Sequence, residues 1–304
     1  MPKKYDYEKL QPLITRIHVL AQRRRNLVKF KTRFTNSIQG TVRWYVNGSM
    51  NKPFIEKTPE SDEMCRFIEK HHKALLTGKI QVNGTIPKPK EVDEPLWLQI
   101  DMRFIARLQF DQEIQNINKE LEKLAKQLPF ADRVEGPEFP GFGLLNYALL
   151  IGTAGNLVDY QNPGKLWKQM GLAPITKNGI TQAGSTWRMQ GGLSAEEWAE
   201  AKYSPQRRSM VWNFGAGLIR AGGGKKERNR YTKLYYDVKK YEAKKRPDLT
   251  PRQIDLRARR KMEKRLLRDI WQMWREGCAP SKVKPVKVGL NKPKRMIERR
   301  RLSM

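Results

Sequence analysis

The stretch that decides the fold reads FPGFGLLNYALLIG and spans residues 139–152. Gly141 and Gly143 flank one apolar residue, Phe142, directly before a run of apolar, helix-compatible residues. Glycine adopts positive φ angles without strain, and a helix that follows such a turn aims free N–H groups at an anion. The stretch therefore predicts a helix-hairpin-helix element whose backbone grips phosphate. A plain turn between two helices remains the alternative.

Two long helices with heptad patterns precede this stretch. In the first, apolar residues recur at spacings of three and four, and the run ends at Asn47-Gly48; they are Leu13, Ile17, Leu20, Leu27, Phe34, Ile38 and Tyr45. In the second, Pro129 closes the heptad Ile114, Ile117, Leu121, Leu124 and Leu128, with Glu113, Glu120 and Glu122 expected at solvated positions. Such helices form an antiparallel coiled-coil arm, serve as a dimerisation element, or pack in a globular bundle.

The composition along the chain divides it into five segments and predicts a mainly α fold. We expect a basic heptad helix over 1–47, a connector or insertion over 48–95, a coiled-coil helix over 96–135, a helical domain with glycine-rich loops over 136–278, and a basic disordered tail over 279–304. In the fourth segment, a last helix carries one apolar face at Ile254, Ala258, Met262, Leu266, Ile270 and Trp274. Basic side chains surround the rest of that helix, which can bury one stripe and offer another to phosphate.

The charge of the chain predicts a polyanionic partner. With 61 Lys and Arg against 31 Asp and Glu, the net charge is +30, and 28 of the basic side chains fall in residues 225–304. Because neither basic end presents a wide unpartnered apolar face, nucleic acid is favoured over a membrane surface. Besides the two glycines, the candidate contacts are Arg23, Arg24, Arg25, Lys29, Arg188, Arg207, Arg208, Arg259, Arg260, Lys264 and Arg265.

Residue types and motifs that the sequence lacks argue against several other classes of protein. Cys65 and Cys278 are the only cysteines, so we expect no disulfide framework and no zinc site; Cys65, His71 and His72 are expected as exposed helix side chains. The sequence has no G-x-G-x-x-G dinucleotide fingerprint and no converging carboxylates for a two-metal site. We also expect neither a leader peptide nor a membrane-spanning segment. We expect a cytoplasmic, nucleoid-associated protein.

Ser185 is the one candidate nucleophile. It lies in the run Ala183-Gly-Ser-Thr-Trp-Arg188, which reads as a glycine-rich loop with a guanidinium nearby. A serine that attacks a phosphodiester needs positive charge to stabilise the transition state. An ordinary loop serine remains the alternative on these grounds.

One longer run resembles a known family. Residues 140–174, PGFGLLNYALLIGTAGNLVDYQNPGKLWKQMGLAP, are similar to the opening of the C-terminal domain of insertion-sequence transposases of the Piv-invertase or DEDD type, the bridge-RNA-guided recombinases. The segments around Tyr231–Tyr236 and Ala258–Trp271 resemble that domain's closing helices, and RRRNLVKFKTRFTNSIQGTVRW at 23–44 resembles the basic helix after its RuvC-like domain. The similarity covers most of residues 15–275.

The resemblance implies DNA strand exchange through a serine–DNA phosphoester, with structured RNA as guide and a homo-oligomer built through the heptad helices. Two departures matter. The RuvC-like domain, which supplies the family's acidic residues and Mg²⁺, has no counterpart here, so these would act in trans, and this chain itself is expected to hold no cofactor. The family's serine aligns with Asn178, which cannot form a phosphoester, so Ser185 would have to take that role.

The sequence thus leaves three functions open. The first is a transposase-like protein that binds double-stranded DNA. The second is a catalytically inactive DNA- or RNA-binding accessory or regulatory protein derived from a mobile element. The third, suggested by the basic tail, is a ribosome- or RNA-associated structural protein.

Overall fold

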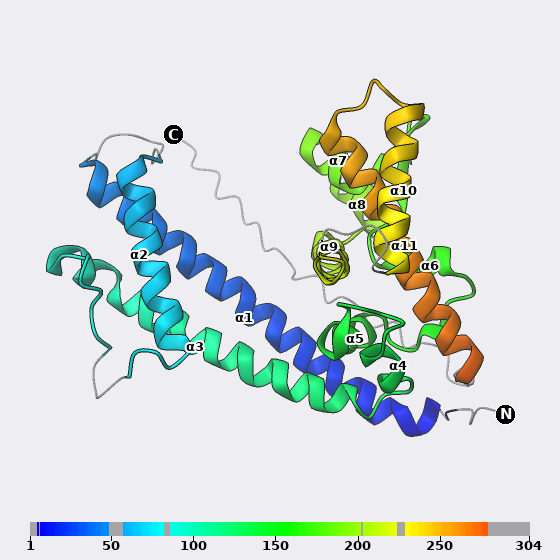
Figure 1. Cartoon of the computed structure of the whole chain (residues 1–304), viewed down its shortest axis with the longest axis horizontal. Coiled ribbons are helices and arrows are strands. Elements are labelled where there is room, and N and C mark those ends of the chain that lie inside the picture. The colour runs from blue at the N-terminus through cyan, green and yellow to red at the C-terminus, as the bar shows by residue number, and fades with distance from the viewer. Residues whose placement is uncertain are drawn as a thin grey trace, which may run out of the picture.

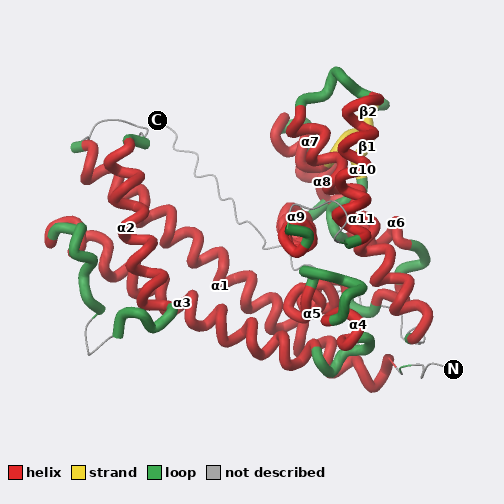
Figure 2. The backbone as a smooth tube through the Cα atoms, in the orientation of Figure 1, coloured by secondary structure: helices red, strands yellow, loops and turns green. Residues whose placement is uncertain are grey.

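The computed structural model describes residues 5, 7–48, 57–81, 86–201, 203–223 and 229–278. Over these residues the chain is mainly α, as predicted, with one two-stranded antiparallel hairpin (Figures 1 and 2). The elements are α1 (Tyr7–Asn47), α2 (Pro59–Leu76), α3 (Glu94–Ala125), α4 (Ala131–Glu135), α5 (Gly143–Ala154), η1 (Leu157–Asp159), α6 (Pro163–Gln169), β1 (Pro174–Lys177), β2 (Ile180–Ala183), α7 (Gly184–Gln190), α8 (Ala195–Ala201), α9 (Pro205–Ala221), α10 (Arg230–Lys245) and α11 (Pro251–Gly277). The tail at 279–304, expected to be disordered, lies outside the described residues.

A repeated cap-and-proline signal sets where the helices begin. Helices α2, α6, α9 and α11 each start with proline directly after a capping side chain, at Thr58, Asn162, Ser204 and Thr250. Each cap accepts a hydrogen bond from a backbone N–H of the first turn, and proline at the first helical position loses no intrahelical bond there. These local signals in the sequence set where each of the four helices starts.

Helices α1 and α3 run antiparallel and form one long arm (Figure 1). The predicted heptad of the second helix is confirmed as buried. Two of the acidic residues expected at solvated positions instead pair across the arm, as Arg16–Glu120 at 2.6 Å and Arg23–Glu113 at 2.6 Å. A third ion pair across the arm joins Lys31 to Asp111 at 2.5 Å. Of the heptad predicted for the first helix, Ile17 and Ile38 are buried and the other five residues are half-buried. The two helices pack on each other within one chain.

The predicted helix over 96–135 is interrupted. Helix α3 ends at Ala125, and α4 begins at Ala131 after Pro129 and Phe130, whose φ of +63° is left-handed. Proline cannot continue the backbone hydrogen bonding of a helix, which explains the break. The chain then turns back, so that α4 and α5 form the helix pair that the glycine stretch predicted.

Two hydrophobic cores hold the molecule together, and they do not follow the predicted segment boundaries. One core, at the far end of the arm, joins α1 and α3 to α2, so the segment 48–95 contributes a third helix to a bundle. The other unites the near ends of α1 and α3 with α5, α9, α10 and α11. Residues of α1 and α3 thus belong to the same core as the domain expected to begin at residue 136.

Helix α11 is the central element of the second core, which we call the head. Its predicted apolar face is buried from Ala258 to Trp274. Trp274 Nε1 donates to the Tyr147 hydroxyl at 2.7 Å, and that hydroxyl donates to the Pro129 carbonyl at 2.5 Å. The largest buried side chains of the head therefore keep their polar atoms hydrogen-bonded, as burial requires.

His72 differs from the exposed helix side chain that the sequence predicted. Only 3% exposed, it lies 3.4 Å from Asp111, with Arg107 and Glu69 close by and Lys31 on the far side of Asp111. Burial and the Arg107 guanidinium lower the pKa of His72 to about 4. The imidazole is therefore neutral in the folded arm at neutral pH.

This burial predicts an acid-sensitive arm. Because the folded pKa of about 4 lies below the ordinary value of 6.5, the contribution of neutral His72 to the free energy of unfolding is complete above pH 6.5. It is lost as pH falls toward 4, by about 3 kcal/mol at most. Urea unfolding followed by circular dichroism between pH 7.5 and 4.5 measures it.

The matched comparison is His72→Asn against His71→Asn at the neighbouring, half-exposed imidazole. The first variant should flatten the pH dependence between 6.5 and 4.5, and the second should keep it. An unchanged pH dependence in His72→Asn would show that His72 does not govern it.

Candidate nucleic-acid interface

The glycine hairpin before α5 has the left-handed backbone that its sequence predicted. Gly141 has a φ of +79° and Gly143 a φ of +69°. The two positions differ in their surroundings. A Cβ on Gly141 would lie 2.4 Å from the Gly217 carbonyl oxygen of α9, whereas a Cβ on Gly143 meets nothing within 4 Å. Gly141 therefore lets the hairpin pack on α9, and Gly143 leaves the start of α5 open to an approaching group.

Two of the predicted arginines on α1 already have partners in the arm. Arg23 pairs with Glu113, and Arg24 Nε donates to Asn118 Oδ1 at 2.6 Å. Their neighbours Arg25 and Lys29 make no hydrogen bond or ion pair with any described residue. The basic run on α1 therefore divides into side chains that hold α3 and side chains free for another partner.

Arg25 faces a second cation across the head. Burial lowers the pKa of Arg25, and the guanidinium of Arg207 on α9 lowers it further. Arg207 Nη1 donates to the Gln169 carbonyl at 3.3 Å, and no carboxylate lies on it in the described part of the chain. Helices α1 and α9 thus bring two like charges together, which is unfavourable unless an anion comes between them.

The next residue, Arg208, belongs to a larger group that we call the arginine cluster: Arg188 of α7, Arg208 of α9, and Arg259 and Arg260 of α11. Arg188, Arg208 and Arg260 all act on the hydroxyl of Tyr203, whose pKa burial raises and these three guanidiniums pull down. Three helices far apart in sequence therefore converge on one tyrosine.

Guanidiniums of the arginine cluster contact one buried carboxylate, that of Glu263, and one indole ring, that of Trp212. Glu263 is fully buried, with Oε2 at 2.9 Å from Arg208 Nη1 and Oε1 at 3.5 Å from Arg259 Nε. The Arg259 guanidinium carbon lies 3.3 Å from the ring centroid of Trp212, and Arg259 Nη2 donates to the Trp212 carbonyl at 2.6 Å. Cation–π contact and one ion pair hold these guanidiniums in place.

Positive charge is in excess at this site. Three guanidiniums, those of Arg208, Arg259 and Arg260, act on Glu263, and Arg188 acts on Tyr203 beside two of them. Arg260 makes no ion pair or hydrogen bond with any described residue. Burial lowers the pKa of Arg260, and Arg208 lowers it further. Burial raises the pKa of Glu263 to about 6. Charges held out of water without full compensation are costly, and they favour binding of an external anion.

The two remaining residues of α11 that were predicted to contact nucleic acid, Lys264 and Arg265, differ in their surroundings. The Lys264 ammonium lies 5.1 Å from the centroid of the Trp167 ring, and its pKa is lowered by burial and then by Arg260. Arg265 instead pairs with Asp269 at 2.9 Å on the exposed side of the helix. Lys264 therefore extends the arginine cluster, whereas Arg265 shares the Asp269 carboxylate with Arg230 and Arg268.

The structure places Asn178 and Ser185 on neighbouring elements. Asn178 and Gly179 both have positive φ, +50° and +74°, and join β1 to β2. A two-residue hairpin turn with this backbone favours Asn-Gly, so Asn178 has a structural role. Ser185 lies in the first turn of α7 rather than in the expected loop; it is exposed, and Arg188 follows one turn later.

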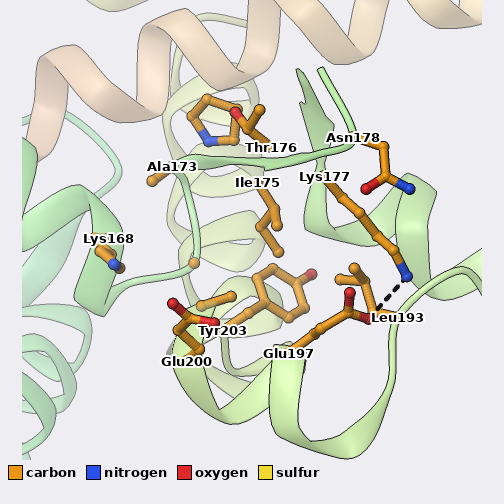
Figure 3. A pocket seen from close by; sticks show the side chains of 13 residues that line it. Lys168, Ala173, Ile175, Thr176, Lys177, Asn178, Leu193, Glu197, Glu200 and Tyr203 are labelled. Carbon is orange, nitrogen blue, oxygen red and sulfur yellow. Dashed lines mark hydrogen bonds and ion pairs between the residues drawn. The ribbon is translucent and has the colours of Figure 1, made fainter. Parts of the chain in front are cut away.

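A cavity of about 430 Å³ opens beside the hairpin (Figure 3). Its lining carries two lysines, Lys168 and Lys177, and two glutamates, Glu197 and Glu200, with Lys177 Nζ 2.9 Å from Glu197 Oε2. Figure 3 shows Tyr203 projecting between the hairpin and α8. Its lysines and glutamates balance in number, so the lining has no excess of positive charge, unlike the arginine cluster.

Sequence reasoning missed Tyr203, Trp212 and Glu263. A signal for one of them was present: Glu263 is the single acidic residue in the run RARRKMEKRLLR at 257–268. A lone carboxylate beside the apolar stripe of a basic helix indicates a buried counter-ion. Nothing in the sequence placed Tyr203 and Trp212 against it.

Among the described residues, no group of three or more His, Cys, Asp or Glu side chains is arranged to hold a metal ion. No helix in that part of the chain is both long and apolar enough to cross a bilayer. Comparison with protein-family models, curated proteins and solved structures returned no match.

The different surroundings of the two hairpin glycines predict different effects of alanine. Gly141→Ala should lower the free energy of unfolding by more than 3 kcal/mol, about 1–2 from left-handed strain and the rest from overlap with Gly217. Gly143→Ala, the matched control, should cost about 1–2 kcal/mol from strain alone. Chemical unfolding of both variants measures the difference, and equal losses would contradict a packing role for Gly141.

Proposed function

We propose that this protein binds double-stranded DNA through its phosphate backbone, with the arginine cluster of the head as the principal contact. The observation that carries the proposal is the excess of guanidinium groups over carboxylates around Tyr203 and Glu263. Arginine presents a planar fork of donors that matches phosphate oxygens. Contacts of this kind fix register on a duplex without reading base sequence.

Other features of the molecule agree with a backbone contact. Arg25 and Lys29 on α1 and Arg207 on α9 supply further cations without carboxylate partners in the described chain. Arg207 directly precedes Arg208 on α9 and acts on Arg25, so these two cations, Arg25 and Arg207, lie beside the arginine cluster. A phosphate strand that follows them would pass from the head toward the arm.

Binding should show the signature of charge neutralisation. We expect the affinity for a 30-base-pair duplex of arbitrary sequence, measured by fluorescence anisotropy, to fall steeply with salt. Arg260→Gln should reduce the slope of log K against log salt by about 1, the loss of one phosphate contact. A second duplex of unrelated sequence should give the same reduction.

The control is Arg133→Gln, which removes the same charge at a guanidinium that donates two hydrogen bonds to the Glu138 carboxylate and is neutralised by it. It should weaken binding slightly and leave the slope unchanged. Equal slopes for wild type and Arg260→Gln would remove Arg260 from the interface.

A second candidate function is DNA strand exchange of the kind that the resemblance to DEDD-type transposases implies. The exposed Ser185 favours it, because Arg188 of the arginine cluster lies one turn further along the same helix. In that reaction the Ser185 hydroxyl oxygen would replace one bridging oxygen of a phosphodiester, and the released DNA hydroxyl would take the proton. A guide RNA, a second copy of the chain and Mg²⁺ on an acidic domain in trans belong to this candidate only.

Strand exchange predicts a covalent protein–DNA adduct. Purified protein, supplied with DNA from its own locus, Mg²⁺ and total cellular RNA, should form a species that resists SDS. Ser185→Ala should abolish it, and Ser194→Ala, at an exposed serine before α8, should not. Salt-sensitive binding without an adduct would instead favour a DNA-binding accessory protein that does not cut.

A further inference from the structure

The buried carboxylate of Glu263 lies against the guanidiniums that a phosphate would contact, so a bound phosphate would change the ionisation of this carboxylate. Its oxygens lie against Arg208 and Arg259, and Arg260 is the third guanidinium that acts on it. From α9, the backbone at Gly215 closes one side, because a Cβ there would lie 2.8 Å from Glu263 Oε1. Two other titratable groups act on the cluster: Tyr203, beyond Arg208 and Arg260, and Asp255, which acts on Arg259 and is paired with Lys239 at 3.0 Å.

We propose that the arginine cluster is a proton-linked phosphate site, in which Glu263 takes up one proton from solvent when a phosphodiester binds to Arg208 and Arg260. This inference rests on the proposed function, since the phosphodiester is that of the bound nucleic acid. The two anions share the same guanidiniums, so a phosphate close to Glu263 disfavours its ionised form. Protonation of Glu263 in turn frees guanidinium donors for the phosphate.

The buried donors show why one carboxylate does not satisfy the site. Arg208 Nη1, Arg259 Nε and Arg260 Nε are all buried and make no hydrogen bond with the described residues. Arg208 and Arg259 approach Glu263 closely enough for ion pairs but not in hydrogen-bonding alignment. Tetrahedral phosphate oxygens can accept from several guanidiniums at once, which a single fixed carboxylate cannot.

The pKa of Glu263 places the proposed coupling between proton uptake and phosphate binding in a pH range that binding experiments can reach. Burial raises the pKa of this carboxyl group to about 6, against the attraction of Arg208, Arg259 and Arg260. The group is therefore mostly ionised at pH 7.5 and mostly protonated at pH 5.5. Linkage is reciprocal, so a phosphate that promotes protonation binds more tightly at the lower pH. If the bound phosphate raises this pKa by one unit, affinity increases about sixfold between pH 7.5 and pH 5.5.

The test compares wild type, Glu263→Gln and Arg260→Gln at these two pH values with the same 30-base-pair duplex. Wild type should bind about sixfold more tightly at pH 5.5 through this linkage. Glu263→Gln, which keeps the volume and removes the charge, should bind at pH 7.5 as wild type does at pH 5.5. The chain's imidazoles, His18, His71 and His72, are present in every variant, so their titration cancels in the comparison.

Proton uptake can also be measured directly. Calorimetric titration of DNA at pH 6.5, in two buffers of different ionisation enthalpy, should show uptake of a fraction of a proton by wild type and less by both variants. Circular dichroism establishes that each variant is folded. If Glu263→Gln does not fold, Arg260→Gln, at a partly exposed side chain, carries the comparison.

A separate probe distinguishes failure of this inference from failure of the proposed function. Sulfate, which does not titrate between pH 5.5 and 7.5, should raise the melting temperature of wild type more at pH 5.5 and should do so less in Arg260→Gln. DNA binding with the same pH dependence in wild type and Glu263→Gln overturns the proton linkage alone. Absence of DNA binding overturns the proposed function, and the sulfate result then decides whether the cluster is an anion site.

Discussion

The close approach of two backbones, at Gly141 in the hairpin and Gly217 in α9, is the constraint on which the head depends. A side chain at either position would overlap the other backbone, at 2.4 Å from one carbonyl oxygen and 2.3 Å from the other. This contact fixes where α9 lies relative to α5, and α9 carries Arg207 toward α1 and Arg208 toward α11. The glycines that suggested a phosphate grip therefore also position the side chains that supply the positive charge.

Where positive charge remains on the folded chain depends on which basic side chains pair with carboxylates as well as on where the sequence places them. In the arm, acidic residues of α2 and α3 neutralise basic residues of α1 and α3, as in Arg23–Glu113 and Arg107–Glu69. In the head, Arg188 and Arg260 have no carboxylate of their own, and Arg208 and Arg259 share Glu263. Two guanidiniums without a carboxylate partner among the described residues, Arg188 and Arg260, therefore lie where α7, α9 and α11 meet.

The parts of the fold that could be predicted are those encoded locally. The heptad from Ile114 to Leu128 and the apolar face of α11 follow from residue spacing, and the left-handed glycines follow from the need for a tight turn. Pairing across the chain could not be predicted, since Glu113 lies 90 residues from Arg23 in sequence. The burial of His72 was missed for the same reason, because its neighbour Asp111 comes from a different helix.

The candidate site shows the same limit more sharply. Its arginines could be named from composition, but their roles depend on one buried carboxylate and two aromatic rings that tertiary packing supplies. Arg259 is fixed by Trp212 and Glu263, so its guanidinium has little freedom to turn toward a ligand. Arg260, one residue further around the same helix, makes no ion pair or hydrogen bond with any described residue. Adjacent arginines of one basic run thus divide into one whose guanidinium is fixed by tertiary contacts and one whose guanidinium is not, a distinction that comes from the packing of α9 on α11.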